Sequence, residues 1–346
     1  MGRRVLVTGL GSFWGGRVAQ TLEQDPEVDV IIGLDTREPS VPLDRTEYVR
    51  VDESYSILSR IVRATHVDTI VHTFLVVDSN QVSASQMHDT NVIGTMNLFA
   101  AASQPESRVR NVVVKSSTLV YGSTHADPVW FSEDTRRPAF PRLRVERSLI
   151  EVEGYVRDYA TDNPHVVVSL LRFSNVLGED IVTPITRALD MAVVPAVFGY
   201  DPRVQFVHEV DVVRAIMHVL DHDLGGIYNV AGDGLLPWSE VAAICGKRLA
   251  PLPPVGRRLV ASTLSRLGLV DMPTELIELL TYGRGADNRR LKEAGFTYRY
   301  TSAGAVHAYA EAARLRRTVG QRMPYRYERD VEQFFRHSPA VVRDQA

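Results

Sequence analysis

The fold of this chain is decided near its beginning, by residues 5–18, which read VLVTGLGSFWGGRV. Val5 to Val7 form a short apolar run that predicts a buried parallel strand. The four glycines that follow predict a sharp turn in which the backbone can approach a ligand. From Phe13 apolar residues recur at helical spacing, so the positive amino end of a helix faces this turn. Together, strand, turn and helix start predict a binding site for a pyrophosphate.

A second apolar run, Val28 to Leu34, ends in Asp35. The distance from the glycines to Asp35 is that of a dinucleotide-binding fold, in which an acid at this place holds the hydroxyls of the adenosine ribose. A carboxylate there repels a 2′-phosphate and so favours NAD over NADP, although Arg37 offsets part of that repulsion. The alternative is that Asp35 only caps a loop.

Length and composition indicate a soluble globular protein. The 346 residues are 45% hydrophobic, which is enough for one large domain and a smaller lobe. No apolar run approaches the roughly eighteen residues that span a bilayer, and a strand begins at once, so we expect a cytoplasmic protein without a signal peptide. The net charge of -3 argues against nucleic acid or a membrane surface as a partner.

Two residue types limit the possible chemistry. Cys245 is the only cysteine, which excludes an intramolecular disulfide and a thiolate metal site within one chain, and we expect no bound metal. Of the 39 basic residues only Lys115, Lys247 and Lys292 are lysines, and all the others are arginines. Few residues can therefore serve as a catalytic lysine.

Downstream of Asp35, apolar strands alternate with amphipathic helices. The pattern predicts strands at 48–51, 67–73, 109–117 and 165–173, and helices at 54–64, 85–103 and 142–160. Such alternation predicts an α/β fold of the Rossmann type, with a doubly wound parallel sheet between two layers of helices. Ligands bind such sheets at the carboxyl ends of the strands.

Beyond Asn175 the pattern becomes irregular and richer in Pro and Gly. We therefore divide the chain into a dinucleotide-binding domain, residues 1–175 with 203–230 returning to it, and a smaller substrate-binding lobe, residues 176–202 and 231–314. The lobe is expected to close over the cleft, because ligand sites favour the junction of two lobes. Residues 315–346 form a polar tail that we expect to pack loosely.

Eight motifs in a fixed order carry a family resemblance. They are Thr8-Gly9 through Gly15, Asp35, Asp52, His72, Asn91-Val92-Ile93-Gly94-Thr95, Ser116-Ser117-Thr118-Leu119-Val120-Tyr121-Gly122, Leu171-Arg172-Phe173-Ser174-Asn175-Val176-Leu177-Gly178 and Phe206-Val207-His208-Glu209-Val210-Asp211. With them the chain resembles, from Val5 to about Ala310, an extended short-chain dehydrogenase/reductase of the NAD-dependent epimerase/dehydratase family. The likeness is to its divergent UDP-glucose 4-epimerase-like branch.

The resemblance implies NAD as cofactor, a nucleotide sugar as substrate, and epimerase, dehydratase or reductase activity. Family members commonly form homodimers through the helices that correspond to 85–103 and 142–160 here. The resemblance further implies cofactor contacts from Gly9, Gly11, Ser12, Phe13, Trp14, Gly15, Asp35, Arg37, Asp52, His72 and Asn91. Of these, Gly9 and Gly15 would hold the pyrophosphate, and Asp52 would hold the adenine.

The resemblance also assigns roles to single residues nearer the reacting atoms. Ser117 matches the family's catalytic serine, which binds the reacting hydroxyl; alternatively, it only ends a buried strand. Asn175 matches a residue that contacts the diphosphate of a nucleotide sugar. Asn91 would lie near the nicotinamide ribose, or its amide would only satisfy backbone groups within a helix. The Tyr121 ring would pack beneath the site, and His208 and Asp211 are interpreted as structural.

The sequence departs from the family where the chemistry is done. The family uses a tyrosine to remove the hydroxyl proton and a lysine four residues later to lower the pKa of that tyrosine. No tyrosine-x-x-x-lysine occurs in this chain. Aligning the helix on Glu151 places Leu143 at the tyrosine and Arg147 at the lysine. Arginine can hold a ribose, but leucine cannot move a proton, so family chemistry here requires a substitute base.

One substitute is Lys115, which shares a strand face with Ser117 by the two-residue period of a strand. Lys115 could equally point to solvent or pair with a carboxylate. His125 and Glu133 are other possible bases. The alternative function is that of an NAD-binding sensor or assembly partner without turnover.

Two smaller departures concern the cofactor. Ser12 stands where the family has glycine, so its hydroxyl could join the phosphate contact. After His72 the family prefers small residues, whereas Thr73, Phe74 and Leu75 stand here. Their bulk is expected to narrow the nicotinamide end of the pocket.

Overall fold

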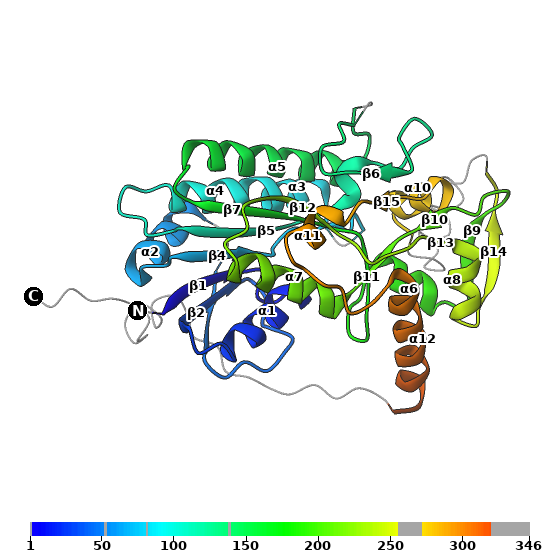
Figure 1. Ribbon diagram of the computed structural model, residues 1–346, viewed down its shortest axis with the longest axis horizontal. Helices are drawn as coiled ribbons and strands as arrows, with labels where there is room; N and C mark the ends of the chain where they lie inside the picture. Colours follow the sequence, from blue (N-terminus) through cyan, green and yellow to red (C-terminus); the bar gives the residue numbers. More distant parts are fainter. Residues whose placement is uncertain (1, 52–53, 81, 138–139, 255–271, 320–346) are drawn as a thin grey trace, which may run out of the picture.

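The computed structural model describes residues 2–51, 54–80, 82–137, 140–254 and 272–319. Its centre is a seven-stranded parallel sheet with the strand order β12-β7-β5-β4-β1-β2-β3 (Figure 1). The strands are β1 (Arg3–Thr8), β2 (Val28–Asp35), β3 (Thr46–Arg50), β4 (Thr69–His72), β5 (Asn111–Ser117), β7 (Val167–Phe173) and β12 (Gly226–Val230). This confirms the predicted Rossmann-type α/β fold.

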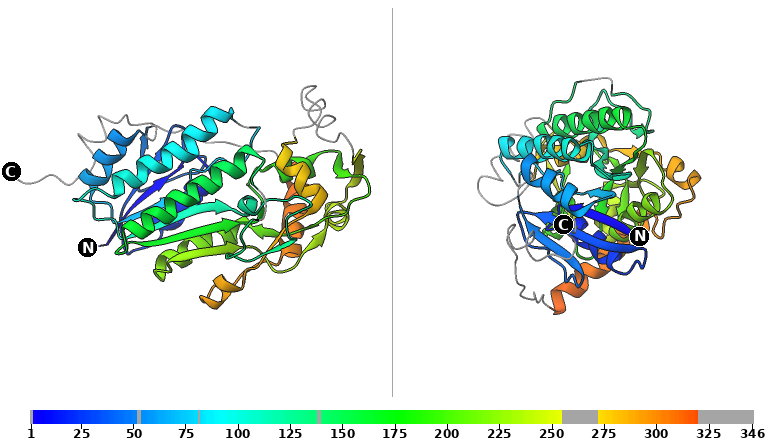
Figure 2. Two further views of the ribbon diagram at one scale, coloured as in Figure 1. Left: turned by 90° about the horizontal axis from the view of Figure 1, so that it is seen from above. Right: turned by 90° about the vertical axis from the view of Figure 1, so that its left-hand side faces the viewer.

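Helices cover both faces of the sheet. On one face lie α2 (Tyr55–Thr65), α4 (Gly94–Ala102) and α5 (Arg144–Asp162), and on the other lie α1 (Phe13–Glu23) and α7 (Glu209–Asp221). Figure 2 shows α4 and α5 side by side on the sheet. The predicted helix at 85–103 consists of α3 (Ala84–His88), a π-helical turn η1 (Asp89–Ile93) and α4.

The central strand β1 shows why the apolar runs are continuous. Leu6 packs into the core beneath α2, α4 and α5, whereas Val5 and Val7 pack into the core beneath α1 and α7. A strand that is covered on both faces needs apolar side chains at successive positions. The run that predicted a buried strand therefore reflects its place in the middle of the sheet.

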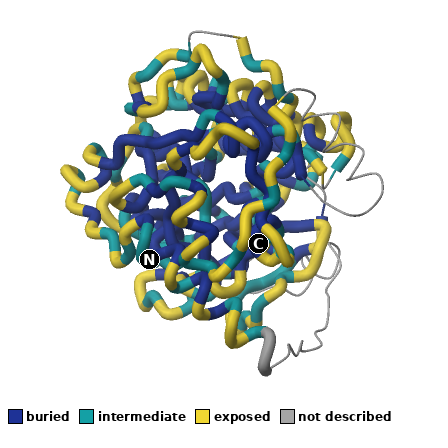
Figure 3. The backbone as a smooth tube through the Cα atoms, turned by 90° about the vertical axis from the view of Figure 1, so that its right-hand side faces the viewer, coloured by how far each residue is buried: buried dark blue, intermediate teal, exposed yellow. Residues whose placement is uncertain are grey.

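A smaller lobe has its own core, formed around the buried side chains of Trp238, Leu280 and Tyr309. Its elements are β8 (Asn175–Leu177), α6 (Pro184–Asp190), β9 (Val193–Val197), β10 (Arg203–Val204), β11 (Phe206–His208), β13 (Leu236–Pro237), α8 (Trp238–Ile244), β14 (Arg248–Leu252), α10 (Thr274–Tyr282) and α12 (Ser302–Val319). The described residues also form four two-stranded sheets: β10-β13, β11-β8, β14-β9 and β15 (Gly285–Ala286) with β6 (Trp130–Phe131). Figure 3 shows the molecule from the side of the lobe, with buried backbone inside and exposed loops around it.

The structure places some segments differently from the predicted division. Residues 203–208 form β10 and β11, which pair with β13 and β8 rather than with the main sheet. The helix α11 (Arg289–Glu293) lies within the range assigned to the lobe, but Leu291 packs into the core beneath α7. Residues 315–319 form the last part of α12, where Leu315 is exposed; residues 320–346 lie outside the described residues. No helix of the described chain is long and apolar enough to span a membrane.

Candidate functional site

A cavity of about 750 Å³ lies at the carboxyl ends of the central strands, between the sheet and the lobe. The strand order reverses between β1 and β4, which is where α/β sheets of this kind bind ligands. The walls come from the turn after β1, the loop after β4, the end of β5 and, on the lobe side, α6 and α10. Both domains thus contribute to one site.

The glycine turn forms one end of this cavity. Gly9 has a φ of +76°, a conformation that residues with a side chain rarely adopt. A Cβ at Gly15 would lie 2.2 Å from the carbonyl oxygen of Gly9, so the first turn of α1 packs directly on the bend. Ser12 caps α1 by accepting a hydrogen bond from the Gly15 amide at 3.2 Å.

The residues of the turn divide into two groups. Gly11, Ser12, Phe13 and Trp14 line the cavity. Gly9 and Gly15, which the sequence analysis assigned to the pyrophosphate, are absent from the wall and shape the turn from behind. The Trp14 ring stacks on Phe173 with ring centroids 6.3 Å apart and does not fill the cavity.

Asp35 both braces the turn and faces the cavity. Its carboxylate accepts hydrogen bonds from the Gly11 amide at 3.0 Å and the Arg37 amide at 2.9 Å. Asp35 and Arg37 line the wall next to the glycine turn. Asp35 therefore does cap the loop, as the alternative interpretation held. It also lines the cavity, where a ligand can contact it. Asp52, expected to hold the adenine, lies outside the described residues.

Lys115 and Ser117 lie at the opposite end, and both line the cavity. Ser117 ends β5, and its hydroxyl oxygen accepts a hydrogen bond from the Leu119 amide at 3.2 Å. Lys115 is only 6% exposed, and its ammonium donates to the carbonyl oxygen of Leu75 at 3.4 Å. Burial lowers the pKa of Lys115 to about 8. Of the outcomes considered for Lys115, the structure excludes a side chain in open solvent.

Three further polar side chains line the cavity, from β8, the residue before it and the lobe. Asn175 lines it while its amide donates to the carbonyl oxygen of Gln205 at 2.9 Å. Ser174 Oγ and Arg284 Nε are buried in the wall and have no hydrogen-bond partner among the described residues. Burial lowers the pKa of Arg284 to about 10, and its Nη1 donates to the carbonyl oxygen of Gly122 at 3.1 Å.

Sequence reasoning missed Arg284 and Ser174. Arg284 follows α10 in an irregular region of a chain rich in arginine, so composition gave no reason to single it out. Ser174 lies within the family motif Leu171–Gly178, but its hydroxyl stands out only because the structure shows no hydrogen-bond partner for it among the described residues. The flanking glycines of Arg284 were the one available signal, since they mark a tight passage of the chain.

Two residues expected to contact the cofactor, His72 and Asn91, make buried hydrogen bonds within the fold. His72 is fully buried, with one ring nitrogen 2.6 Å from Thr8 Oγ1 and the other 3.0 Å from Thr95 Oγ1. Burial lowers its pKa to about 3, so the ring is neutral and joins β1, β4 and α4. Asn91 is also fully buried and uses its amide to hold both backbone groups of Val76. Neither residue lines the cavity: the His72 ring bonds to Thr8 and Thr95, and the Asn91 amide holds the loop after β4.

The position that corresponds to the family's lysine is not in the site. Arg147 is exposed on α5, and its guanidinium donates to the carbonyl oxygen of Pro141 at 3.0 Å. Leu143 precedes α5 and packs against the core. Neither lines the cavity, so the geometry gives no support to the expected catalytic role of Arg147, which stays a prediction.

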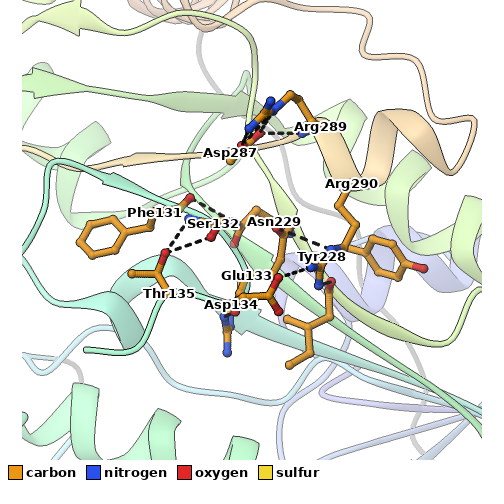
Figure 4. A network of polar contacts seen from close by, with 12 residues as sticks. Phe131, Ser132, Glu133, Asp134, Thr135, Tyr228, Asn229, Asp287, Arg289 and Arg290 are labelled. Atoms are coloured by element: carbon orange, nitrogen blue, oxygen red, sulfur yellow. Dashed lines mark hydrogen bonds and ion pairs between the residues drawn. The ribbon is translucent and has the colours of Figure 1, made fainter. Parts of the chain in front are cut away.

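The other two possible bases also lie elsewhere. Glu133 Oε1 accepts from the Asn229 amide at 2.8 Å, and Asp134 pairs with Arg290, in a network that ties β12 to the segment after β6 (Figure 4). His125 lies beside the ring of Tyr282. Neither Glu133 nor His125 lines the cavity, so the geometry does not favour either as the base there.

Tyr121, His208 and Asp211 make contacts within the fold. Tyr121 is buried, donates to Asn229 Oδ1 at 2.8 Å and stacks on Phe131. His208 stacks on Tyr300 and caps the start of α7, and Asp211 accepts from the backbone amides of Arg299 and Tyr300, in the loop before α12. All three support the fold. Phe74 lines the cavity without closing it.

A parallel sheet with a glycine turn, an acid after β2 and a cavity at the switch point defines a dinucleotide-binding α/β protein. Residues 5–231 match the NAD dependent epimerase/dehydratase family. The chain belongs to this family, whose cofactor is NAD.

Relatives and solved structures agree with this assignment. An uncharacterized protein of Mycobacterium tuberculosis (strain ATCC 25618 / H37Rv) is 33% identical over 316 residues, covering 88% of this chain and 82% of that protein. The dTDP-D-glucose 4,6-dehydratase of Homo sapiens is 26% identical over 247 residues, covering 66% of this chain and 69% of that protein.

Two crystal structures show the same fold. The UDP-glucose 4-epimerase from Bifidobacterium longum in complex with NAD⁺ and UDP has a TM-score of 0.71 at 18% identity, covering 92% of this chain and all of the other. The UDP-glucuronic acid 4-epimerase from Bacillus cereus in complex with NAD has a TM-score of 0.68 at 16% identity, covering 90% and 99%.

Proposed function

We propose that the protein binds NAD in the cavity and transfers hydride to or from the sugar of a nucleotide sugar, with Lys115 in place of the family's tyrosine. The reaction is an epimerisation, a dehydration or a reduction. The observation that carries the proposal is that Lys115 and Ser117, on one face of β5, line the same cavity as the glycine turn. Among the described residues, Lys115 is the only lysine in the wall of that cavity.

The residues present fit the cofactor. The turn brings backbone and the capped amino end of α1 to the wall, and such helix ends bind phosphate. Asp35 lies beside it, where a carboxylate would hold ribose hydroxyls and disfavour a 2′-phosphate. Bound NAD supplies the hydride acceptor or donor.

Lys115 and Ser117 then divide the handling of the proton. Because Ser117 Oγ already accepts from the Leu119 amide, its own proton is available to a sugar oxygen. With a pKa of about 8, Lys115 has roughly a tenth of its amine unprotonated at pH 7, enough to accept a proton in turnover. An unperturbed lysine would be protonated almost completely at that pH.

The cation and hydroxyl on the lobe side suit the nucleotide end of the substrate. Arg284 offers an unpartnered guanidinium nitrogen, a good donor to a diphosphate oxygen. Asn175 and Ser174 are placed to add further polar contacts. These contacts recognise the diphosphate and leave the identity of the sugar open.

Turnover on a panel of UDP- and dTDP-sugars with NAD tests the proposal. We expect interconversion of at least one sugar nucleotide, detected by chromatography or absorbance of the reduced cofactor. Ser117→Ala should abolish it, whereas Ser56→Ala, at an exposed position of α2 away from the cavity, should have no effect. Turnover that survives Ser117→Ala would contradict the assigned site.

A second candidate function is NAD binding without turnover, as a sensor or an assembly partner. The observation that favours it is the absence of Leu143 and Arg147 from the cavity wall, since the family's proton-transfer pair then has no counterpart in its usual place. Tight binding of NAD or NADH without turnover on any sugar nucleotide, together with a ligand-dependent partner, would select it.

We also propose that two copies associate through η1, α4 and α5. Ile93, Met96 and Ile150 lie on these helices and are 37–39% exposed, an apolar surface that a second copy would cover. Light scattering should show a dimer in the parent protein and a monomer in Ile150→Glu.

A further inference from the structure

Lys115 differs from the other two lysines of the chain in its surroundings. Lys292 is exposed and pairs with Asp233 at 3.1 Å. Lys247 is half-buried and donates to the carbonyl oxygen of Met191 at 2.5 Å. Only Lys115 is buried and faces a cavity. Of the three lysine side chains, one is therefore buried beside a cavity and the other two are accessible to solvent.

The positive charge of Lys115 has no counter-charge in the described part of the chain. No carboxylate there lies within ion-pair distance of it, and its one contact is the carbonyl oxygen of Leu75 at 3.4 Å. Two carboxylates of the cavity wall, Asp78 from the loop after β4 and Glu275 from α10, are engaged elsewhere: Asp78 pairs with Arg187, and Glu275 accepts from Ser79. A buried amine without a carboxylate favours its neutral, nucleophilic form.

We propose that the Lys115 amine forms an imine with the carbonyl group of a nucleotide-linked keto sugar held in the cavity. The inference deepens the proposed function and rests on it in one respect, since a keto sugar is what hydride removal from a sugar carbon produces. It assigns Lys115 a covalent role and names the substrate class as keto sugars, whether made in this site or supplied by another oxidising or dehydrating enzyme.

The chemical step balances without a further reactant. The nitrogen lone pair attacks the carbonyl carbon, a C–N bond forms, and the carbonyl oxygen takes up a proton to give a carbinolamine. The hydroxyl group then leaves as water with a second proton, and a C=N bond remains. The Ser117 hydroxyl, which lines the same wall, is placed to pass a proton to the departing oxygen.

Such an imine would reduce the need for the strong base that the family's tyrosine supplies. A protonated imine withdraws electrons from the neighbouring carbon more strongly than a ketone does, so the proton on that carbon is removed more easily. Epimerisation beside the carbonyl, or elimination of water from the next carbons, then needs a weaker base. Addition of water to the C=N bond releases the product and regenerates the amine.

Reductive trapping on the full-length protein tests the proposal. The first probe is pyridoxal 5′-phosphate, an aldehyde with an anionic group that Arg284 can pair with, and the second is a dTDP-linked 4-keto sugar. Sodium cyanoborohydride converts any imine to a stable amine, and peptide mass spectrometry locates it. At pH 7.5 we expect the first probe to label Lys115 at least about tenfold faster than Lys247 or Lys292, because a larger fraction of its amine is neutral.

The matched variants are Lys115→Arg, which keeps the charge and cannot form an imine, and Lys247→Arg, which should label Lys115 as the parent does. Wild-type mapping alone decides the matter if Lys115→Arg does not fold. Labelling of Lys115 no faster than that of the other lysines, or failure of the keto sugar to become attached to it, overturns the proposal.

Failure of this inference is distinguishable from failure of the proposed function. Trapping needs neither NAD nor turnover, and calorimetry with NAD on the same preparation reports cofactor binding separately. A protein that binds NAD and interconverts sugar nucleotides but gives no adduct at Lys115 keeps the proposed function and loses the covalent step. A protein that forms the adduct but binds no NAD keeps the covalent step and loses the proposed function.

Discussion

The two ends of the cavity differ in what builds them. At the glycine turn the shape of the wall is set by the backbone, through Gly9, Gly15 and the capped start of α1. At the end of β5 the wall is side chains, and there Lys115 and Ser117 stand without the tyrosine that the family uses. A site built from backbone survives many substitutions, whereas chemistry done by side chains changes with a single residue. Binding and reaction can therefore diverge separately in one fold.

The largest effect on stability and NAD binding is expected from a substitution in the glycine turn. In Gly9→Val, a β-branched residue must adopt a φ of +76°, and its Cβ would lie 2.8 Å from the Cα of Phe74. We expect a loss of about 2–4 kcal/mol in the free energy of unfolding and no detectable NAD binding by calorimetry.

Gly154→Ala is the matched control for that variant. This glycine lies inside α5 with nothing within 4 Å of an added Cβ, so we expect a gain of about 0.5–1 kcal/mol and unchanged NAD affinity. Equal NAD binding by Gly9→Val and the parent would mean that the turn does not form the cofactor site.

At the side-chain end, Lys115→Met should lower turnover by about 10²-fold or more while leaving NAD bound, because general-base catalysis contributes that much. In the parent, kcat/KM should rise as the pH passes through about 8, where Lys115 loses its proton. A flat profile across that range would argue against Lys115 as the base.

The same variant should be more stable than the parent. Because the pKa of Lys115 is lowered from 10.5 to about 8, the folded state binds fewer protons than the unfolded state between those values. The cost of the buried charge is therefore fully present below pH 8 and disappears as the pH rises to 10.5. We expect Lys115→Met to gain up to about 3 kcal/mol at pH 7 and much less at pH 10.5, measured by urea denaturation. Lower stability at pH 7 would indicate a structural role instead.

An intermediate effect is expected on the lobe side. Arg284→Met removes a guanidinium whose Nε has no hydrogen-bond partner among the described residues, and it should weaken binding of a UDP-sugar by about 10- to 100-fold, as loss of a charged hydrogen bond does. NAD affinity should stay within a factor of about two, because the glycine turn is untouched. Titration calorimetry with each ligand separates the two, and equal losses for both would point to a misfolded lobe.

The smallest effect is expected at the position that aligns with the family's lysine. Arg147→Ala removes an exposed side chain that contacts only the carbonyl oxygen of Pro141 among the described residues. Turnover and stability should change less than about twofold and 0.5 kcal/mol, respectively. A tenfold loss of activity in steady-state assays would restore Arg147 to the catalytic site.

Particular residues show how far sequence reasoning reached. The strand, the turn and Asp35 are neighbours in the chain, so their spacing alone predicted one end of the cavity. Asn91 and His72 also stand at family positions. However, the Asn91 side chain hydrogen-bonds to Val76, and the His72 ring hydrogen-bonds to Thr8 and Thr95. Spacing locates such residues without showing which hydrogen bonds they make.

The sequence by itself determined the sheet, the glycine turn and the absence of a tyrosine-lysine pair, because these depend on local periodicity and on residue identity. Only the tertiary structure decided that Lys115 is buried and has no described carboxylate partner, that Arg147 lies on the surface, and that Arg284 enters from a distant segment. The physical reason is that burial and charge pairing depend on what the rest of the chain brings into contact with a residue. Residue type and spacing carry no record of those long-range contacts.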